Sequence, residues 1–377
     1  MKVARYILGA LWAIAFVLGL IGLYQRLTHG HLLAGYGSYV VWGLWVAAYA
    51  YFVGLSAGSF LLAAVVNVLN VQDLKPLTRP ALWTSFVSLV IAMIGVVLDL
   101  GHMDRAFSLF LRPNFSSMMA WMGVLYGAFG LLLVALAWFI YRKNEGMVKA
   151  LLTMGIPLAV AFPGGGGALF ATLSAKPFWH TPLTPVFFVV GAFVSGCALM
   201  TALAALLWPK RKEMLRLLGR LVIALVAIEL VLEWAEYSIP LWYGVSPEKD
   251  LLMQVLAGPY WWVFWIVHIL LGSAVPVALI LWKPASPGAV GAAGFLTAAT
   301  FLAVRLNIVI PGQITPELQG LESAFVDHRL TFAYAPTTHE WLVMSFLVSA
   351  AVGLLWLGFR LLPLIDSKEV QRYERAA

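Results

Sequence analysis

Two groups of ionisable residues interrupt or close long apolar stretches, and their spacing suggests proton chemistry. Asp99 and His102 end one such stretch three residues apart, which puts them on one face of a helix. A carboxylate beside an imidazole can hold the imidazole in one tautomer and favour its protonation. Such a pair suits a site that binds a quinone carbonyl and gives or takes a proton. The alternative is a helix cap with an Asp–Arg ion pair at the membrane surface.

The second group is a stripe of acids in a later apolar stretch. Glu229, Glu233 and Glu236 occupy positions i, i+4 and i+7 and therefore share one helix face. The rise of a helix places Glu229 near mid-membrane, and His268 and Arg305 are expected at similar or slightly more outward depths. Charged groups inside a membrane are costly and are functional candidates by default. We interpret these residues as a proton-transfer relay; an internal ion-pair network that fixes helix register is the alternative.

The elements that must position these groups are transmembrane helices. Of 377 residues, 62% are hydrophobic and 11% charged, whereas a soluble domain has roughly 25% charged residues. Apolar runs of about 20 residues, the length that spans a bilayer as a helix, recur along the chain, and alternating barrel strands are absent from the pattern. The sequence predicts an all-α polytopic membrane protein of about ten transmembrane helices, approximately 5–24, 39–68, 81–103, 117–142, 150–172, 183–208, 216–238, 258–282, 288–310 and 340–364.

The distribution of basic residues predicts the orientation of these helices. The N-terminal side, its alternating loops and the C-terminal tail hold 17 of the 24 Lys and Arg residues, and the other side holds 7. The positive-inside rule therefore places both termini in the cytoplasm and Asp99 and His102 near the outer face. The net charge of +7 is then a topology signal. We expect a multi-pass protein of the inner (cytoplasmic) membrane whose partner is the lipid bilayer, with no nucleic acid.

A weak internal repeat suggests two four-helix bundles with one flanking helix at each end. The segment from Leu89 to Asp99 is similar to that from Leu221 to Glu233, and Ser56-Ala57-Gly58 is similar to Ser195-Gly196. The predicted division is a first transmembrane helix and outer loop (1–38), a first bundle with the quinone-site candidate (39–182), a second bundle (183–310), and an outer loop, last transmembrane helix and cytoplasmic tail (311–377).

No haem, iron–sulfur cluster or other metal site is expected in this chain. Its one cysteine, Cys197, cannot ligate an iron–sulfur cluster, which needs several thiolates. A bis-His haem needs two facing histidines inside the helices, and only His268 lies well inside one. The run Pro163-Gly164-Gly165-Gly166-Gly167 lacks the Lys-Ser/Thr of a phosphate loop. It is interpreted as a close helix-packing segment, or as part of a ligand cavity.

Three motifs occur in a fixed order over about residues 45–200: Gly54-Leu55-Ser56-Ala57-Gly58; then Asp99-Leu100-Gly101-His102-Met103-Asp104-Arg105-Ala106-Phe107 with Arg112-Pro113-Asn114; and then Lys176-Pro177-Phe178-Trp179-His180-Thr181-Pro182. Together they resemble the NrfD/polysulfide-reductase membrane-subunit family. The corresponding family segments read Gly-Leu-Ala-Ala-Gly, Asp-Leu-Gly-Arg-Pro…Arg-Phe…Pro-Asn, and Arg-Pro-Leu-Trp-Asn-Thr-Pro. Two departures concern the site: the family's Arg-Pro is His102-Met103 here, and its Tyr-Thr-Gly aligns with Gly165-Gly166-Gly167.

The resemblance implies a quinone- or quinol-reactive subunit of a respiratory oxidoreductase complex, inactive on its own. The bound substrate would be menaquinone or ubiquinone in the outer half of the first bundle, with Asp99 and His102 handling protons. Tyr49 or His102 would replace the missing hydroxyl. An iron–sulfur, ferredoxin-like subunit would dock on the outer face and connect to a molybdopterin, hydrogenase or multihaem catalytic subunit. The residues implied in docking are Asp104, Arg105, Arg112, Lys176, Trp179 and His180.

Two other functions are compatible with the pattern. Internal repeats and a glycine-broken helix also occur in secondary transporters, although the second repeat shows no matching glycine break. A membrane anchor without its own quinone site is the third interpretation.

Overall fold

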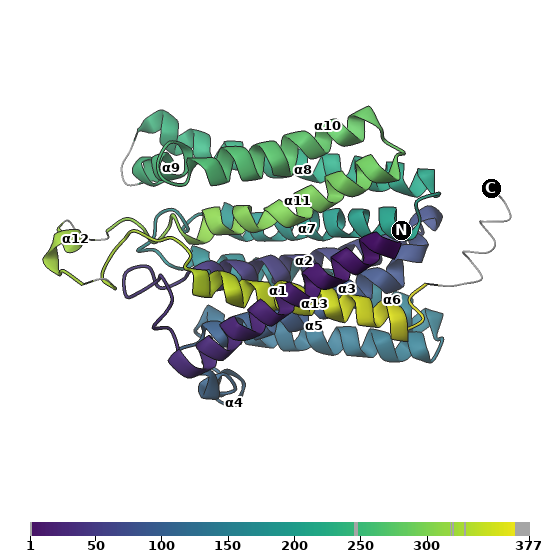
Figure 1. Ribbon diagram of the computed structural model, residues 1–377, viewed down its shortest axis with the longest axis horizontal. Coiled ribbons are helices and arrows are strands. Elements are labelled where there is room, and N and C mark those ends of the chain that lie inside the picture. The colour runs from purple at the N-terminus through teal and green to yellow at the C-terminus, as the bar shows by residue number, and fades with distance from the viewer. Residues whose placement is uncertain (1, 245–247, 317, 319, 328, 366–377) are drawn as a thin grey trace.

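The computed structural model describes residues 2–244, 248–316, 318, 320–327 and 329–365. These residues form an all-helical bundle with short connections at both ends (Figure 1). The long helices are α1 (Lys2–His29), α2 (Leu44–Val68), α3 (Thr78–Asp99), α5 (Met118–Tyr141), α6 (Glu145–Ala171), α7 (Leu183–Leu207), α8 (Lys212–Tyr243), η3 (Val263–Ala274) continued by α10 (Val275–Trp282), α11 (Pro287–Val309) and α13 (Thr338–Leu361). The short ones are η1 (Gln72–Leu77), η2 (Met103–Arg105), α4 (Ser108–Leu111), α9 (Glu248–Leu256) and α12 (Leu321–Ala324).

Nine helices in the described ranges are long and apolar enough to cross a membrane, which confirms the prediction of a polytopic membrane protein. The remaining long helix, α8, spans 32 residues and packs against α7, α10 and α11. It is less apolar than the other nine because it carries Glu229, Glu233 and Glu236 in addition to the charged residues of its first turns. We treat α8 as a tenth membrane-spanning helix, since it runs alongside them (Figure 1).

The bundle has two distinct ends. Helix α1 begins and α13 ends at the same end, which we call the terminal end (Figure 1). Helices α4, α9 and α12 lie at the opposite end, which we call the distal end. Asp99 closes α3 at the distal end. The predicted cytoplasmic tail beyond residue 365 lies outside the described residues.

Helix α2 lies at the centre of the molecule, and most of its side chains are buried. It packs against α3 and α6 on one side and against α7 and α11 on the other. Helices α5 and α6 pack together beside it, α7 packs with α8 and α11, and α1 pairs with α13 on the face of α3. Groups on either side of α2 therefore meet the same central helix.

Small residues allow α2 and α7 to approach closely. A methyl group added at Gly58 would overlap the carbonyl oxygen of Ala192, and one added at Gly196 would overlap the backbone of Gly58. These are the glycines of the two segments that suggest the internal repeat. Close backbone approach of this kind is a usual mode of helix association in membranes, where apolar surface alone does not drive packing.

We predict that Gly58→Ala destabilises the protein by about 1–3 kcal/mol, because its methyl group meets backbone, which cannot move aside as a side chain can. Gly9→Ala is the matched control, since nothing lies within 4 Å of a methyl group there. Thermal unfolding in mild detergent measures both variants. Equal melting temperatures for Gly58→Ala and Gly9→Ala would contradict the close crossing of α2 and α7.

Candidate functional site

A buried arginine organises the distal end around Asp99. Arg26, near the end of α1, is 2% exposed. Its Nε donates to the carbonyl oxygen of Leu98 at 2.6 Å, and its Nη2 donates to that of Leu100 at 2.7 Å. The last carbonyls of a helix lack partners within it and favour a nearby cation. Arg26 therefore closes the C-terminus of α3 and holds Asp99 in place between the two carbonyls that it binds.

A directional chain of hydrogen bonds leads from Arg26 to Asp99. Arg26 Nη2 lies 2.8 Å from His31 Nε2, and His31 Nδ1 lies 2.6 Å from the hydroxyl of Tyr36. A guanidinium only donates, so His31 must accept at Nε2 and carry its proton on Nδ1. His31 then donates to Tyr36, and Tyr36 donates to the Asp99 carboxylate, with which it is hydrogen-bonded.

The electrostatics of the loop between α1 and α2 keep this chain in one protonation state. Burial and the Arg26 guanidinium lower the pKa of His31, so the neutral imidazole is favoured. Burial and the nearby carboxylates of Asp99 and Glu340 raise the pKa of Tyr36, so its hydroxyl keeps the proton that it donates. The chain thus presents a fixed donor to Asp99.

Asp99 itself is incompletely satisfied. Its Oδ1 is buried and has no hydrogen-bond partner among the residues that the structure describes. A buried carboxylate oxygen without a partner is costly, and such atoms in native proteins point to a ligand, a proton or a water. Asp99 Oδ1 is therefore the strongest sign of a binding site at the distal end.

Glu340, the other buried carboxylate of this region, differs from Asp99 in that both of its oxygens accept hydrogen bonds from the protein. Its Oε2 accepts from the backbone N–H groups of Thr337 at 2.9 Å and Gly35 at 3.0 Å. Its Oε1 accepts from the hydroxyl of Tyr334 at 2.5 Å. Glu340 and Thr337 also form the capping box that begins α13. Every oxygen is occupied, so Glu340 fixes α13 to the loop before α2 and leaves nothing for a ligand.

Tyrosine hydroxyls lie one helical turn deeper in the first bundle. Tyr49 of α2 packs beside Gly95, four residues before Asp99 on α3. Its hydroxyl is hydrogen-bonded to that of Tyr126 on α5. The ring of Tyr126 in turn meets Phe162 of α6 edge-on, with centroids 4.8 Å apart. Phenolic donors and aromatic walls thus lie between α2, α5 and α6, directly inward of Asp99.

The structure separates His102 from Asp99, which corrects the expectation that they share a helix face. Helix α3 ends at Asp99, and Leu100 takes an extended conformation, so His102 lies on the following loop. The side chain of His102 is 69% exposed, and its Nδ1 lies 3.8 Å from an Asp104 oxygen. The chain leaves the helix here because Arg26 binds the carbonyls at its end. Tyr36, to which His31 donates, is hydrogen-bonded to Asp99 where we expected His102.

The residues implied in docking divide into surface and core. Trp179 is 2% exposed, so its assignment to a docking surface is wrong. Its Nε1 donates to the carbonyl oxygen of Ile308 at 2.7 Å, and its ring stacks on Trp42 with centroids 5.6 Å apart. It joins the connection between α6 and α7 to the end of α11. Lys176 is half-buried, whereas the remaining four side chains are exposed at the distal end: Asp104, Arg105, Arg112 and His180.

The acidic stripe of α8 meets its expected partners in the second bundle. His268 Nδ1 lies 3.5 Å from Glu233 Oε1, and both side chains are buried. Arg305 of α11 interacts electrostatically with Glu229. Its guanidinium also lies over the ring of Phe188 at 4.6 Å. The structure thus brings together four of the five predicted proton-transfer residues as two neighbouring pairs.

These two pairs are loosely bonded. Both oxygens of Glu229, as well as Nε and Nη1 of Arg305, are buried without hydrogen-bond partners in the described ranges. His268 lies on η3, a stretch of π-helix, a conformation that is rare and frequent at functional sites. Buried polar groups that are close but not in contact are the setting in which proteins hold internal water.

A small cavity leads from this cluster toward the distal end. It has a volume of about 30 Å³ and is lined by Glu233, Glu236 and Tyr237 of α8, with Thr184 at the start of α7. A cavity needs only about 10–15 Å³ and a few polar partners to hold a water molecule. Glu236, the fifth predicted residue, is half-buried toward the distal end. Water here would connect Glu233 with Glu236.

Sequence reasoning missed the contributions of α1 and of the loop that follows it. Arg26, His31 and Tyr36 come from the segment that we treated as a flanking helix and its outer loop. One signal was available: Arg26 lies at the predicted outer end of an apolar helix, against the charge bias of the chain, and so needed a local partner. Its partners are backbone carbonyls some 72 and 74 positions later in the chain, and nothing in the local pattern reveals them.

Comparison of the sequence with known proteins identifies the family that this chain matches. Residues 33–317 match the model of the family described as polysulphide reductase, NrfD. The chain is 32% identical to a selenate reductase subunit of Mesobacillus selenatarsenatis, over 94% of each chain. It is 27% identical to an Hdr-like menaquinol oxidoreductase integral membrane subunit of Archaeoglobus fulgidus, over 92% of this chain and 90% of the relative. It is 24% identical to a menaquinone reductase integral membrane subunit of Nitratidesulfovibrio vulgaris, over 93% and 89%.

We predict that Trp179→Ala destabilises the protein by about 3–5 kcal/mol, because it removes a buried ring and leaves a cavity. Trp242→Ala is the matched control: Trp242 is 88% exposed, and removal of an exposed side chain changes stability by about 0.5 kcal/mol or less. Thermal unfolding in detergent measures both. If Trp179→Ala melted with the wild type, Trp179 would return to the candidates for a docking surface.

Proposed function

This chain belongs to the NrfD polysulphide reductase family, and from this we propose that it is the quinone- or quinol-reactive integral membrane subunit of a respiratory oxidoreductase complex. Two relatives that match along most of the chain are named as membrane subunits of a menaquinol oxidoreductase and a menaquinone reductase. The substrate would therefore be menaquinone, or another quinone of the same chemistry. The observation that carries the proposal is the buried, unpartnered Oδ1 of Asp99.

The quinone head group would lie between Asp99 and the tyrosine pair Tyr49–Tyr126. A quinone carbonyl gains a proton as the ring is reduced, and a quinol hydroxyl loses one as it is oxidised. Asp99 Oδ1 is a free acceptor for that proton, and Tyr36, on the other carboxylate oxygen, stabilises the charge that results. The phenolic hydroxyls deeper in the bundle offer donors for a second oxygen of the ring. Exposed His102 lies near the surface, where it would pass protons to solvent.

We further propose that the acids of α8 carry protons within the second bundle. Glu229 and Glu233 with Arg305 and His268 form two buried pairs with spare hydrogen-bonding capacity. The water-sized cavity between Glu233 and Glu236 extends them toward the distal end. A fully bonded ion-pair network, the structural alternative, would leave few such atoms unpartnered.

The distal end would carry the docking surface for the electron-transfer partner. The exposed residues Asp104, Arg105, Arg112 and His180 lie there with Asp99. An iron–sulfur, ferredoxin-like subunit seated on it would connect to a molybdopterin, hydrogenase or multihaem catalytic subunit. With the basic loops at the terminal end, this face would be the outer face of the inner (cytoplasmic) membrane, and both chain termini would be cytoplasmic.

We predict that Asp99→Asn lowers quinone-dependent turnover of the purified complex by on the order of 10²-fold, the usual contribution of a positioned proton-transfer group. The amide keeps the shape of the side chain and removes its charge. Asp73→Asn, at the exposed end of η1, is the matched control and should turn over as the wild type does. Co-purification of the partner subunits verifies assembly, and unaltered turnover in an assembled Asp99→Asn complex would refute the site.

The acids of α8 give a separate prediction. In proteoliposomes that hold the intact complex, Glu233→Gln should abolish proton movement across the membrane while leaving electron transfer from quinol measurable. Glu213→Gln, an exposed acid of the same helix that pairs with Arg216, should change neither. A pH-sensitive dye and the electron-acceptor assay, read in parallel, separate the two activities. If proton movement persisted in Glu233→Gln, the relay would be wrong and the quinone site unaffected.

A further inference from the structure

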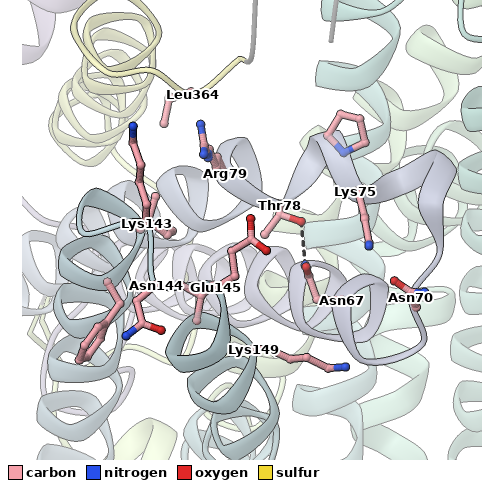
Figure 2. Close-up of a pocket in the computed structure, with 14 residues that line it drawn as sticks. Asn67, Asn70, Lys75, Thr78, Arg79, Lys143, Asn144, Glu145, Lys149 and Leu364 are labelled. Carbon is pink, nitrogen blue, oxygen red and sulfur yellow. Dashed lines mark hydrogen bonds between the residues drawn. The ribbon is translucent and has the colours of Figure 1, made fainter. Parts of the chain in front are cut away.

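A second polar site lies at the terminal end, away from Asp99 and the acids of α8. A pocket of about 570 Å³ forms where the turn after α2 meets the turn between α5 and α6. Four cationic side chains line it: Lys75, Arg79, Lys143 and Lys149. Glu145 is the one carboxylate in the lining. Figure 2 shows Arg79 and Lys143 toward Leu364, and Lys75 and Lys149 on the other side of Glu145.

These cations are not neutralised by the protein. Among the described residues none of the four forms an ion pair, and neither does Glu145. Arg79 donates one hydrogen bond, from Nη1 to the carbonyl oxygen of Pro363 at 3.2 Å. Its other donors and the three ammonium groups remain available. Four cations against one carboxylate give the lining a net positive charge, so the pocket favours an anion.

Uncharged groups in the lining complete a site for oxygen-rich anions. Thr78 opens α3, and its hydroxyl oxygen accepts from the side-chain amide of Asn67 at 2.7 Å. Asn144 caps α6, its side-chain oxygen accepting from the backbone N–H of Met147 at 3.1 Å. The positive end of α6 therefore lies beside the pocket, which adds to the attraction from the side chains.

The pocket lies at the level of lipid head groups. Helix α5, 24 residues long, spans about 36 Å, against roughly 30 Å of hydrocarbon, so its last turn reaches the interface. Exposed Trp138 and Tyr141 in that turn mark the same level. Apolar side chains also line the pocket, among them Phe139, Val148 and Leu364. A small soluble anion would gain nothing from these apolar side chains. A phospholipid has a charged head group for the cations and acyl chains for the apolar side chains.

We propose that this pocket binds the phosphate group of an anionic phospholipid, with the cationic side chains around the phosphate and the acyl chains against the apolar lining residues. Its volume is that of a site for a small molecule or a head group. Basic pockets between transmembrane helices on the cytoplasmic side are known to bind acidic head groups. The lipid would hold together the two turns that join α2 to α3 and α5 to α6.

The positive-inside bias alone does not account for this arrangement. That bias requires basic residues in the loops but no convergence on one cavity. The turn between α7 and α8 shows the difference: Lys210 and Lys212 are exposed, and neither lines the pocket. These lysines supply a charge-matched control.

The test compares two variants with equal loss of charge at the terminal end. One combines Lys75→Gln, Lys143→Gln and Lys149→Gln, and the other combines Lys210→Gln, Lys212→Gln and Lys283→Gln. Both are placed in phosphatidylcholine nanodiscs that contain a minority of phosphatidylglycerol. Native mass spectrometry after release counts the phosphatidylglycerol that stays bound, and thermal unfolding with added inorganic phosphate tests a soluble anion.

We expect the wild type and the control to retain phosphatidylglycerol, and the pocket variant to bind it on the order of 10- to 100-fold more weakly, since three cations near the head group are lost. Equal retention by both variants would overturn the proposal. Stabilisation by inorganic phosphate without retention of phosphatidylglycerol would assign the pocket to a soluble anion and overturn the lipid. If the pocket variant does not fold, the wild type decides: absence of any preference for phosphatidylglycerol over phosphatidylcholine would refute the site.

Discussion

The last carbonyl groups of a helix lack hydrogen-bond partners within that helix. At the end of α3, the guanidinium of Arg26 supplies the missing donors. The same guanidinium gives a further Nη2 donor to His31. Because a guanidinium cannot accept, that single contact sets the tautomer of His31, then the orientation of the Tyr36 hydroxyl, and finally the donor that faces Asp99. The distal site therefore depends on a residue of α1 that no ligand needs to touch.

The bilayer also explains why unpartnered atoms are informative in this protein. Without water to compensate, a buried polar group in the helical region must be bonded within the chain or be costly. Glu340 and Gln313 meet this condition fully; Gln313 accepts from two backbone N–H groups of the α2 entry and donates to two carbonyls. Asp99 and Glu229 do not. The same chain thus contains bonded polar groups that hold helices together and unbonded ones, for which we propose proton exchange.

The long helices and the acidic stripe could be predicted from sequence because both are local patterns. An apolar run of about 20 residues has one stable solution in a membrane, and spacing on one helix determines which of Glu229, Glu233 and Glu236 share a face. The environment of Asp99 could not be predicted in this way. Local spacing paired it with His102, but α3 ends at Asp99, three residues before His102. Tyr36 and His31, from the loop after α1, form the hydrogen bonds there instead. Trp179 shows the same limit, since this tryptophan of a polar loop is buried by Trp42 and by the end of α11, both distant in the sequence.

The central position of α2 bears on how the two halves of the molecule could act together. Tyr49 of α2 faces α3 and α5, and five residues later Gly54 faces α7 and α11. A methyl group at Gly54 would lie 3.5 Å from Nη2 of Arg305, the cation that stands opposite Glu229. Helix α2 therefore contacts, on neighbouring turns, the α3 residue one turn before Asp99 and the arginine that interacts with Glu229. Energetic coupling between sites requires an element that both contact, and among the described helices α2 meets that condition through residues less than two turns apart.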